Sequence, residues 1–122
     1  MFFTMNKEEI IDFFKDTYYQ IKSFSQNDII AIEGDECVAI GIVLSGSIDI
    51  KRMLSNKVIQ MTSFGPGHLF GEVIIFSDVN KYPATVISSS KSEILFISRE
   101  NFKQFTYTHP DFLEMFLRDL SN

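Results

Sequence analysis

A glycine-rich turn near the middle of the chain carries residue types that could hold a small polar ligand. Residues 65–72 read Gly-Pro-Gly-His-Leu-Phe-Gly-Glu. Gly71 permits a tight turn, after which the backbone N–H groups of residues 72–74 can begin a short helical turn that favours an anion. A buried Glu72 carboxylate would accept a hydrogen bond from a hydroxyl group, such as a ribose 2′-hydroxyl. The alternative is a Glu72 carboxylate held only by nearby backbone N–H groups.

Residues for catalysis or metal binding are scarce. Cys37 is the one cysteine, which excludes an internal disulfide and an iron–sulfur cluster. The two histidines, His68 in a turn and His109 before a helix, form no His-x-His pair, which disfavours a jelly-roll metal enzyme. No Gly-x-Ser-x-Gly nucleophile motif is present. We therefore expect no enzyme, no catalytic residue, no metal and no cofactor, while a haem ligated by Cys37 or His68 stays open as an alternative.

Length and charge favour one domain covering residues 1–122. The formal net charge of −5 disfavours tight binding of a nucleic acid backbone by this segment. The N-terminus lacks a basic region followed by an apolar run, and no stretch of about 20 apolar residues is present. We expect a cytoplasmic protein without a membrane partner.

The elements that must position the turn follow a simple order. A helix is predicted over residues 6–19, with Asn6 as N-cap and Glu9 completing a capping box. Runs of β-branched and aromatic residues separated by turn signals then predict strands between 20 and 97. These runs cover residues 29–32, 40–44, 47–51, 58–61, 84–87 and 93–97. The predicted fold is mainly β with flanking α, a jelly-roll (double-stranded β-helix) barrel.

Residues 98–122 are predicted to return to helix. Ser98 can cap a short helix, and Thr108 can cap another with Pro110 in its first turn. The last helix carries apolar residues at helical spacing, which suggests a longer helix cut off in mid-pattern. We expect these residues to form a dimerisation face: Leu113, Phe116, Leu117 and Leu120. The alternative is a helix that simply packs on the barrel.

Three motifs in this order resemble those of the cyclic-nucleotide-binding domain of Crp/Fnr transcription regulators. Residues 33–35 (Glu-Gly-Asp) and 42–48 (Ile-Val-Leu-Ser-Gly-Ser-Ile) look like the family's opening hairpins. The turn at 65–72 looks like its central glycine-rich turn, and residues 82–86 (Tyr-Pro-Ala-Thr-Val) stand where the family carries its phosphate-binding segment. The resemblance implies a ligand-sensing effector domain without a helix-turn-helix. It also implies a ligand site at Phe70, Gly71, Glu72, Val73, Ile74, Tyr82, Pro83, Ala84 and Thr85.

The segment at 82–86 departs from the family at its first two positions. Family members that bind cyclic nucleotides carry an arginine at the position of Tyr82, and its guanidinium pairs with the cyclic phosphate. Tyr82 has no charge, and Pro83 has no backbone N–H. Lys81 is expected to face away, because neighbouring residues in a strand point to opposite faces.

The sequence therefore disfavours cyclic AMP and cyclic GMP and leaves the small-molecule effector unidentified. A ligand with ring character and hydrogen-bonding groups would suit Tyr82 together with Glu72. Two alternatives stay open: a true cyclic-nucleotide site, and a ligand-free interaction module in which Tyr82 fills the pocket. The resemblance implies a homodimer in the parent protein, and contact with DNA only through a domain absent from this sequence.

Overall fold

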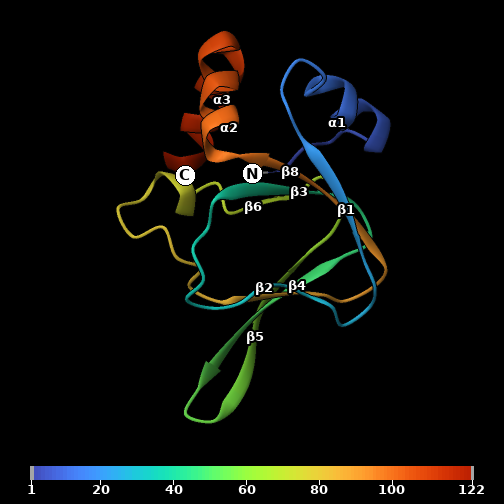
Figure 1. The fold of residues 1–122 in the computed structure, drawn as a ribbon, viewed down its shortest axis with the longest axis vertical. Helices are drawn as coiled ribbons and strands as arrows, with labels where there is room; N and C mark the ends of the chain where they lie inside the picture. Colours follow the sequence, from blue (N-terminus) through green and yellow to red (C-terminus); the bar gives the residue numbers. More distant parts are fainter. Residues whose placement is uncertain (1, 122) are drawn as a thin grey trace.

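Two four-stranded antiparallel sheets lie face to face, and the helices cover the outer face of one of them (Figure 1). The structure is a computed structural model that describes residues 2–121, with side chains described for residues 2–119. The elements in chain order are α1 (Lys7–Phe13), β1 (Gln20–Phe24), β2 (Ile29–Ala31), β3 (Ala39–Ser45), β4 (Ile48–Leu54), β5 (Lys57–Phe64), β6 (Leu69–Phe70), the 3-10 helix η1 (Ile74–Phe76), β7 (Thr85–Ser88), β8 (Ser92–Ser98), α2 (Arg99–Thr108) and α3 (Pro110–Ser121).

The predicted fold class is confirmed, except that the two sheets do not close into a barrel. The first sheet has the order β1-β8-β3-β6 and the second the order β2-β7-β4-β5. In the described residues β1 pairs only with β8, and β2 only with β7. The sandwich is therefore open along two sides, one between β1 and β2 and the other between β6 and β5. The hairpin of β4 and β5 extends beyond the body of the domain (Figure 1).

Helix α1 begins as predicted and ends earlier. The Glu9 N–H donates to Asn6 Oδ1 at 2.9 Å, and the Asn6 N–H donates to Glu9 Oε1 at 3.1 Å, which completes the capping box. The helix ends at Phe13 rather than residue 19. Residues 15–19 read Lys-Asp-Thr-Tyr-Tyr, and four of these five residues are of types with weak helix propensity. The chain also has to reach β1 at Gln20.

Phenylalanine rings join the helices to the first sheet. Phe14 lies with its ring centroid 4.9 Å from that of Phe105, and Phe102 lies 5.3 Å from Phe116. Phe112 contacts Phe105 edge-on at 5.3 Å. Such tilted and edge-on pairs add to the free energy gained from burial alone. The same buried cluster includes apolar residues of β3 and β8, so it fixes α2 and α3 against the first sheet.

The junction between α2 and α3 is tighter than the sequence predicted. Ser98 caps α2 as expected, because its Oγ accepts from the Asn101 N–H at 3.1 Å. Thr108 is not the cap of α3: it is the last residue of α2, and its hydroxyl donates to the Phe105 carbonyl at 3.1 Å. Only His109 separates the two helices.

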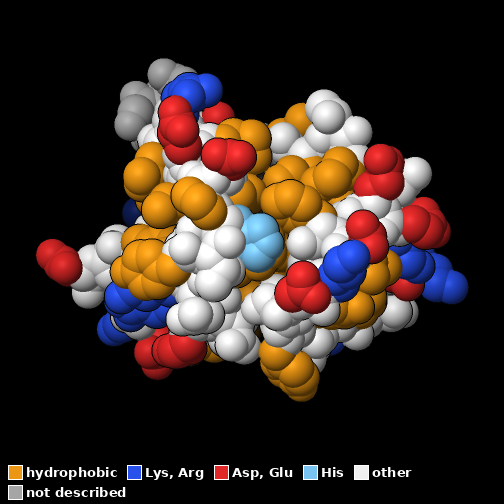
Figure 2. All heavy atoms as spheres, turned by 90° about the horizontal axis from the view of Figure 1, so that it is seen from above, with side chains coloured by type: hydrophobic (Ala, Val, Ile, Leu, Met, Phe, Trp, Pro, Cys, Tyr) orange, Lys and Arg blue, Asp and Glu red, His pale blue; other side chains and the backbone are white. Residues whose placement is uncertain are grey.

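The face that carries the helices has hydrophobic side chains at its surface among charged ones (Figure 2). Among the residues of α2 and α3 up to position 119, the exposed large apolar side chains are Tyr107, Met115 and Leu117. Across residues 2–121, no helix has both the length and the apolar character needed to cross a membrane.

The turn between β3 and β4 requires glycine at position 46. Gly46 has φ +81°, and a Cβ there would meet the Lys91 carbonyl oxygen and lie 2.8 Å from the Cα of Ser92. The Ser47 N–H donates to Ser92 Oγ at 3.0 Å, so this turn is joined to the turn between β7 and β8. A side chain at 46 would force them apart.

We expect Gly46→Ala to lower the free energy of unfolding by about 2 kcal/mol or more, because it adds left-handed strain and a clash with backbone. Gly65→Ala is the matched control: a Cβ there meets nothing within 4 Å, so it should be neutral or stabilise by roughly 0.5 kcal/mol. Urea unfolding measures both. Equal losses in the two variants would contradict the steric explanation.

Candidate functional site

A cavity of about 260 Å³ lies between the two sheets on the side of β6 and β5. Its wall combines β6, the turn that follows it, η1, the segment 82–84 and the inner face of the second sheet. The lining residues are Ile50, Thr62, Phe64, His68, Leu69, Phe70, Gly71, Glu72, Val73, Ile74, Tyr82, Pro83, Ala84 and Val86.

Eight of the nine predicted ligand-binding residues line this cavity, from Phe70 to Ile74 and from Tyr82 to Ala84. Thr85 is not among the lining residues. Side chains alternate along β7, so Ala84 and Val86 face the core, whereas Thr85 faces outward. The Thr85 hydroxyl oxygen instead accepts from the Glu33 N–H at 3.1 Å.

The Gly71 turn has the predicted local form. Gly71 has φ +86°, and a Cβ there would lie 3.1 Å from both the Ala39 carbonyl oxygen and Cys37 Sγ. The Ile75 N–H donates to the Gly71 carbonyl at 3.0 Å, so η1 follows directly. The close approach of the turn to β3 places Glu72 at the cavity wall.

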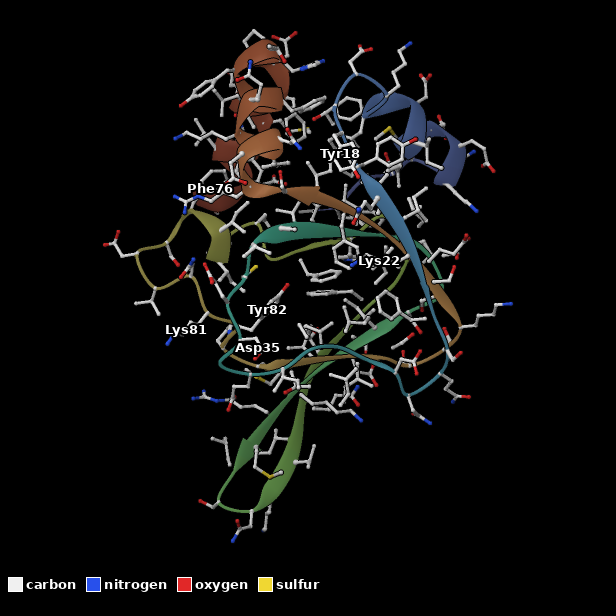
Figure 3. All side chains as sticks on the ribbon, in the orientation of Figure 1. Tyr18, Lys22, Asp35, Phe76, Lys81 and Tyr82 are labelled. Carbon is white, nitrogen blue, oxygen red and sulfur yellow. The ribbon has the colours of Figure 1, made fainter. Side chains whose placement is uncertain are left out.

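Backbone pairing with the turn after β2 sets the direction of the Tyr82 side chain. The Tyr82 N–H donates to the Asp35 carbonyl at 2.9 Å, and the Gly34 N–H donates to the Tyr82 carbonyl at 2.8 Å. Tyr82 consequently points between the sheets, while the exposed Lys81 points away from the cavity (Figure 3). The predicted alternation of Lys81 and Tyr82 is confirmed.

The Tyr82 hydroxyl lies in the core beside the thiol of Cys37. Burial, together with a hydrogen bond to Cys37, raises the pKa of Tyr82 above its ordinary value. Burial also raises the pKa of the Cys37 thiol, and the hydrogen bond from Tyr82 only partly offsets this. The pair is therefore a neutral phenol beside a neutral thiol at physiological pH.

The charges around the cavity do not suit a phosphate. None of the described lining residues is a lysine or an arginine, and Glu72 contributes a carboxylate. A phosphate at this position would have no guanidinium partner and would face a negative group. The other polar groups on the wall belong to Thr62, His68 and Tyr82.

Sequence reasoning missed the part of the wall formed by β4 and β5. Ile50 pairs with Thr62 across these strands, and Ile48 pairs with Phe64. His68 stacks on Phe64 at 4.9 Å with an interplanar angle of 15°, so it is a lining residue and not a surface turn residue. Its Nδ1 is buried without a hydrogen-bond partner among the described residues. The alternation of side chains along residues 58–64 was the available signal, but it does not show which face of this strand points to the core.

The remaining histidine and the acidic residues form no metal centre in the described chain. No group of three or more His, Cys, Asp and Glu side chains within residues 2–121 could hold a metal ion. His109 stacks on Phe105 at 3.9 Å, and its Nδ1 lies 2.9 Å from the Phe105 carbonyl oxygen. This histidine has a structural position at the end of α2.

The four residues predicted for a dimerisation face are not equivalent in the structure. Phe116 is buried, only 2% exposed, against α2. Leu113 is partly buried, and Leu117 is 53% exposed. The side chain of Leu120 lies outside the described residues. A partner could therefore reach Leu113 and Leu117 but not Phe116 without unpacking the core.

Comparison with solved structures finds the same architecture in bacterial regulators. A transcriptional regulator from Thermotoga maritima is 22% identical, with a TM-score of 0.83 over 96% of this chain and 88% of that chain. The catabolite activator protein of Thermus thermophilus is 25% identical, with a TM-score of 0.73 over 97% of this chain and 58% of its own. An EAL enzyme in a half-site-occupied form is 22% identical, with a TM-score of 0.71 over 84% of this chain and 92% of that chain.

Two of these three neighbours are regulators, and the third is an enzyme. No curated protein matches the sequence. The sequence model of the cyclic nucleotide-binding domain matches residues 21–109, well over half of the chain, and includes both segments of the cavity wall. The resemblance read from the three motifs is confirmed, and the chain belongs to the cyclic nucleotide-binding domain family.

Proposed function

We propose that this chain is the ligand-sensing effector domain of a Crp/Fnr-like transcription regulator whose pocket takes a small molecule other than cyclic AMP or cyclic GMP. The family and the regulators among its structural neighbours support the sensing role. The observation that carries the ligand assignment is the cavity wall, which has a carboxylate at Glu72 and a neutral Tyr82 where the family's arginine would stand. No enzymatic step is part of the proposal, and the compartment we propose is the cytoplasm.

The wall suggests an uncharged, largely apolar ligand with hydrogen-bonding groups. Most lining residues are hydrophobic, and aromatic rings of Phe64 and Phe70 offer flat surfaces. The Glu72 carboxylate would accept from a ligand hydroxyl, and the ring of His68 belongs to the same wall. The volume of about 260 Å³ limits the ligand to a small molecule.

A short path of contacts links this cavity to the helices. Ile74 lines the cavity, and Phe76, two residues later in η1, lies 6.2 Å from Phe102 of α2 and 6.0 Å from Phe116 of α3. A ligand that moves η1 would therefore change the packing of both helices. The switch requires a ligand that binds one arrangement more tightly than the other. In the proposed regulator, α3 pairs two subunits and a separate segment contacts DNA.

Ligand choice can be tested with cyclic nucleotides and a restored arginine. We expect millimolar cyclic AMP or cyclic GMP to leave the melting temperature of the unchanged protein within about 1 °C, because no cation faces the phosphate. Tyr82→Arg combined with Pro83→Ala restores the guanidinium and a backbone N–H. If the rest of the wall suits a nucleotide, a cyclic nucleotide at a hundred times its Kd adds about 2.7 kcal/mol to the free energy of unfolding of the double variant. Its melting temperature would then rise by roughly 10 °C, as expected for a domain of this size.

Lys81→Arg is the matched control, because it places a guanidinium one residue away on the outer face. It should give no response to cyclic AMP. A clear rise in melting temperature of the unchanged protein with micromolar cyclic AMP would overturn the assignment at Tyr82. If the double variant also fails to respond, the pocket differs from nucleotide-binding members at more than this segment.

The pairing of two subunits through α3 can be tested by sedimentation velocity. We expect Leu117→Glu to weaken self-association roughly tenfold or more, because it would bury an unpaired carboxylate at the interface. Met115→Glu is the matched control, an exposed apolar residue about half a helical turn away on the same helix. Equal effects of both substitutions, or a protein that is monomeric at every concentration, would contradict this interface.

A further inference from the structure

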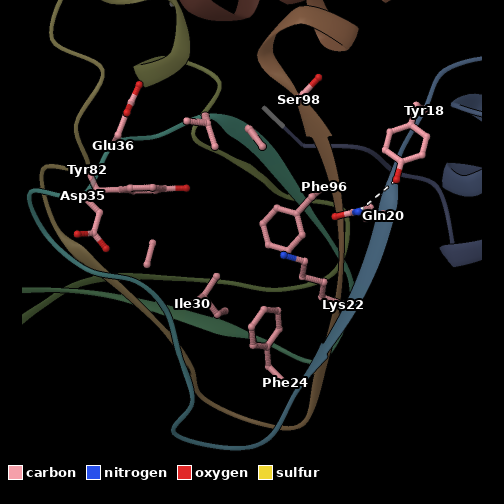
Figure 4. Close-up of a pocket in the computed structure, with 13 residues that line it drawn as sticks. Tyr18, Gln20, Lys22, Phe24, Ile30, Asp35, Glu36, Tyr82, Phe96 and Ser98 are labelled. Carbon is pink, nitrogen blue, oxygen red and sulfur yellow. Dashed lines mark hydrogen bonds between the residues drawn. The ribbon is translucent and has the colours of Figure 1, made fainter.

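A second and larger cavity, of about 490 Å³, lies on the opposite open side of the sandwich (Figure 4). It opens between the edge strands β1 and β2, whereas the family's pocket opens between β6 and β5. Tyr82 lines both cavities. Since neither β1 nor β2 has a second strand partner among the described residues, this side of the core stays open.

The inner surface of this cavity is aromatic and aliphatic. Phe24 and Phe96 lie 6.4 Å apart in an edge-on arrangement, and the ring of Tyr82 approaches from the other side (Figure 4). Ile30 and Ala39 complete the lining between the rings. A flat apolar group would fit against these surfaces, and the volume lies within the range of small-molecule sites.

The charged residues that line the cavity are Lys22 on one side and Asp35 and Glu36 on the other (Figure 4). The Glu36 carboxylate accepts from Asn80 Nδ2 at 3.1 Å. Lys22 projects from β1 with its Nζ 5.5 Å from the centroid of the Phe96 ring. Asp35 lies across the cavity, beside Tyr82 (Figure 4). Neither side chain takes part in the ion pairs formed among residues 2–119. The Lys22 ammonium is therefore held at an aromatic wall, and no carboxylate among residues 2–119 is paired to it.

We propose that this cavity is a second ligand site, and that it takes an aromatic carboxylate with a hydrogen-bond donor at the far end of the ring. The ring would lie among Phe24, Phe96 and Tyr82, and the carboxylate would pair with Lys22. Asp35 would accept from a hydroxyl or amine at the other end. A compact amino acid does not fit this arrangement, because its ammonium and carboxylate groups are attached to the same carbon. Lys22 and Asp35, by contrast, lie on opposite sides of the cavity.

The proposal is independent of the effector assigned to the family's pocket. Lys22, Phe24, Asp35 and Phe96 do not line that pocket. The test substitutes only Lys22, whose side chain is exposed on β1. Tyr82 is the shared residue, and a ligand in either cavity would press on it. Binding at the second site can therefore be tested separately from binding at the family's pocket.

The test uses 4-hydroxybenzoate as probe and the intact 122-residue chain. Isothermal titration calorimetry gives the Kd, and NMR chemical shifts locate the probe. We expect shifts at Phe24, Ile30, Ala39 and Phe96, and a Kd that rises roughly fivefold or more in Lys22→Gln, because one ion pair is lost. The uncharged analogue 4-hydroxybenzamide should bind the unchanged protein and Lys22→Gln with similar, weaker affinity.

Lys57→Gln is the matched control, because it removes the same charge from an exposed position at the start of β5. It should leave the Kd for 4-hydroxybenzoate unchanged. Absence of binding at low millimolar concentration would overturn the proposal. So would shifts confined to Phe64, Val73 and the rest of the family's pocket, or a Kd that is the same in Lys22→Gln and the unchanged protein.

Discussion

Backbone pairing between residues 80–82 and the turn at 34–37 is the constraint on which both cavities depend. Three hydrogen bonds of 2.7 to 2.9 Å hold it: the Cys37 N–H to the Asn80 carbonyl, the Tyr82 N–H to the Asp35 carbonyl, and the Gly34 N–H to the Tyr82 carbonyl. This register turns Tyr82 inward and Lys81 outward. A slip by one residue would exchange the two and place an ammonium in the core.

Once inside, the tyrosine determines the chemistry of its surroundings. Its ring packs against both hydrophobic clusters of the core, and its hydroxyl meets the Cys37 thiol. An arginine in the same place would bring a charge that demands an anion as partner. The neutral tyrosine side chain requires no anionic partner, and Glu72 is then the charged group among the described residues that line the family's pocket. Tyr82 also lines the larger cavity beside β1 and β2.

The elements of the fold could be predicted well where the signal is local. The Asn6 capping box and the Ser98 cap are present as expected, because each depends on residues three positions apart. Predictions failed at two helix ends. The first helix ends at Phe13, and the chain then reaches β1 at Gln20, which pairs with β8. Thr108 is a local failure: its hydroxyl donates to the Phe105 carbonyl, so it ends α2 instead of capping α3.

The sequence by itself determined the family, the Gly71 turn and the loss of the arginine at Tyr82, since each depends on residue type and short spacing. Only the tertiary structure decided which other groups meet these residues. In the tertiary structure Thr85 lies outside the cavity lining, His68 belongs to its wall, and Phe116 is buried against α2. The reason is physical: spacing shows that a strand or helix has an apolar face, but long-range packing selects the surface that the face covers.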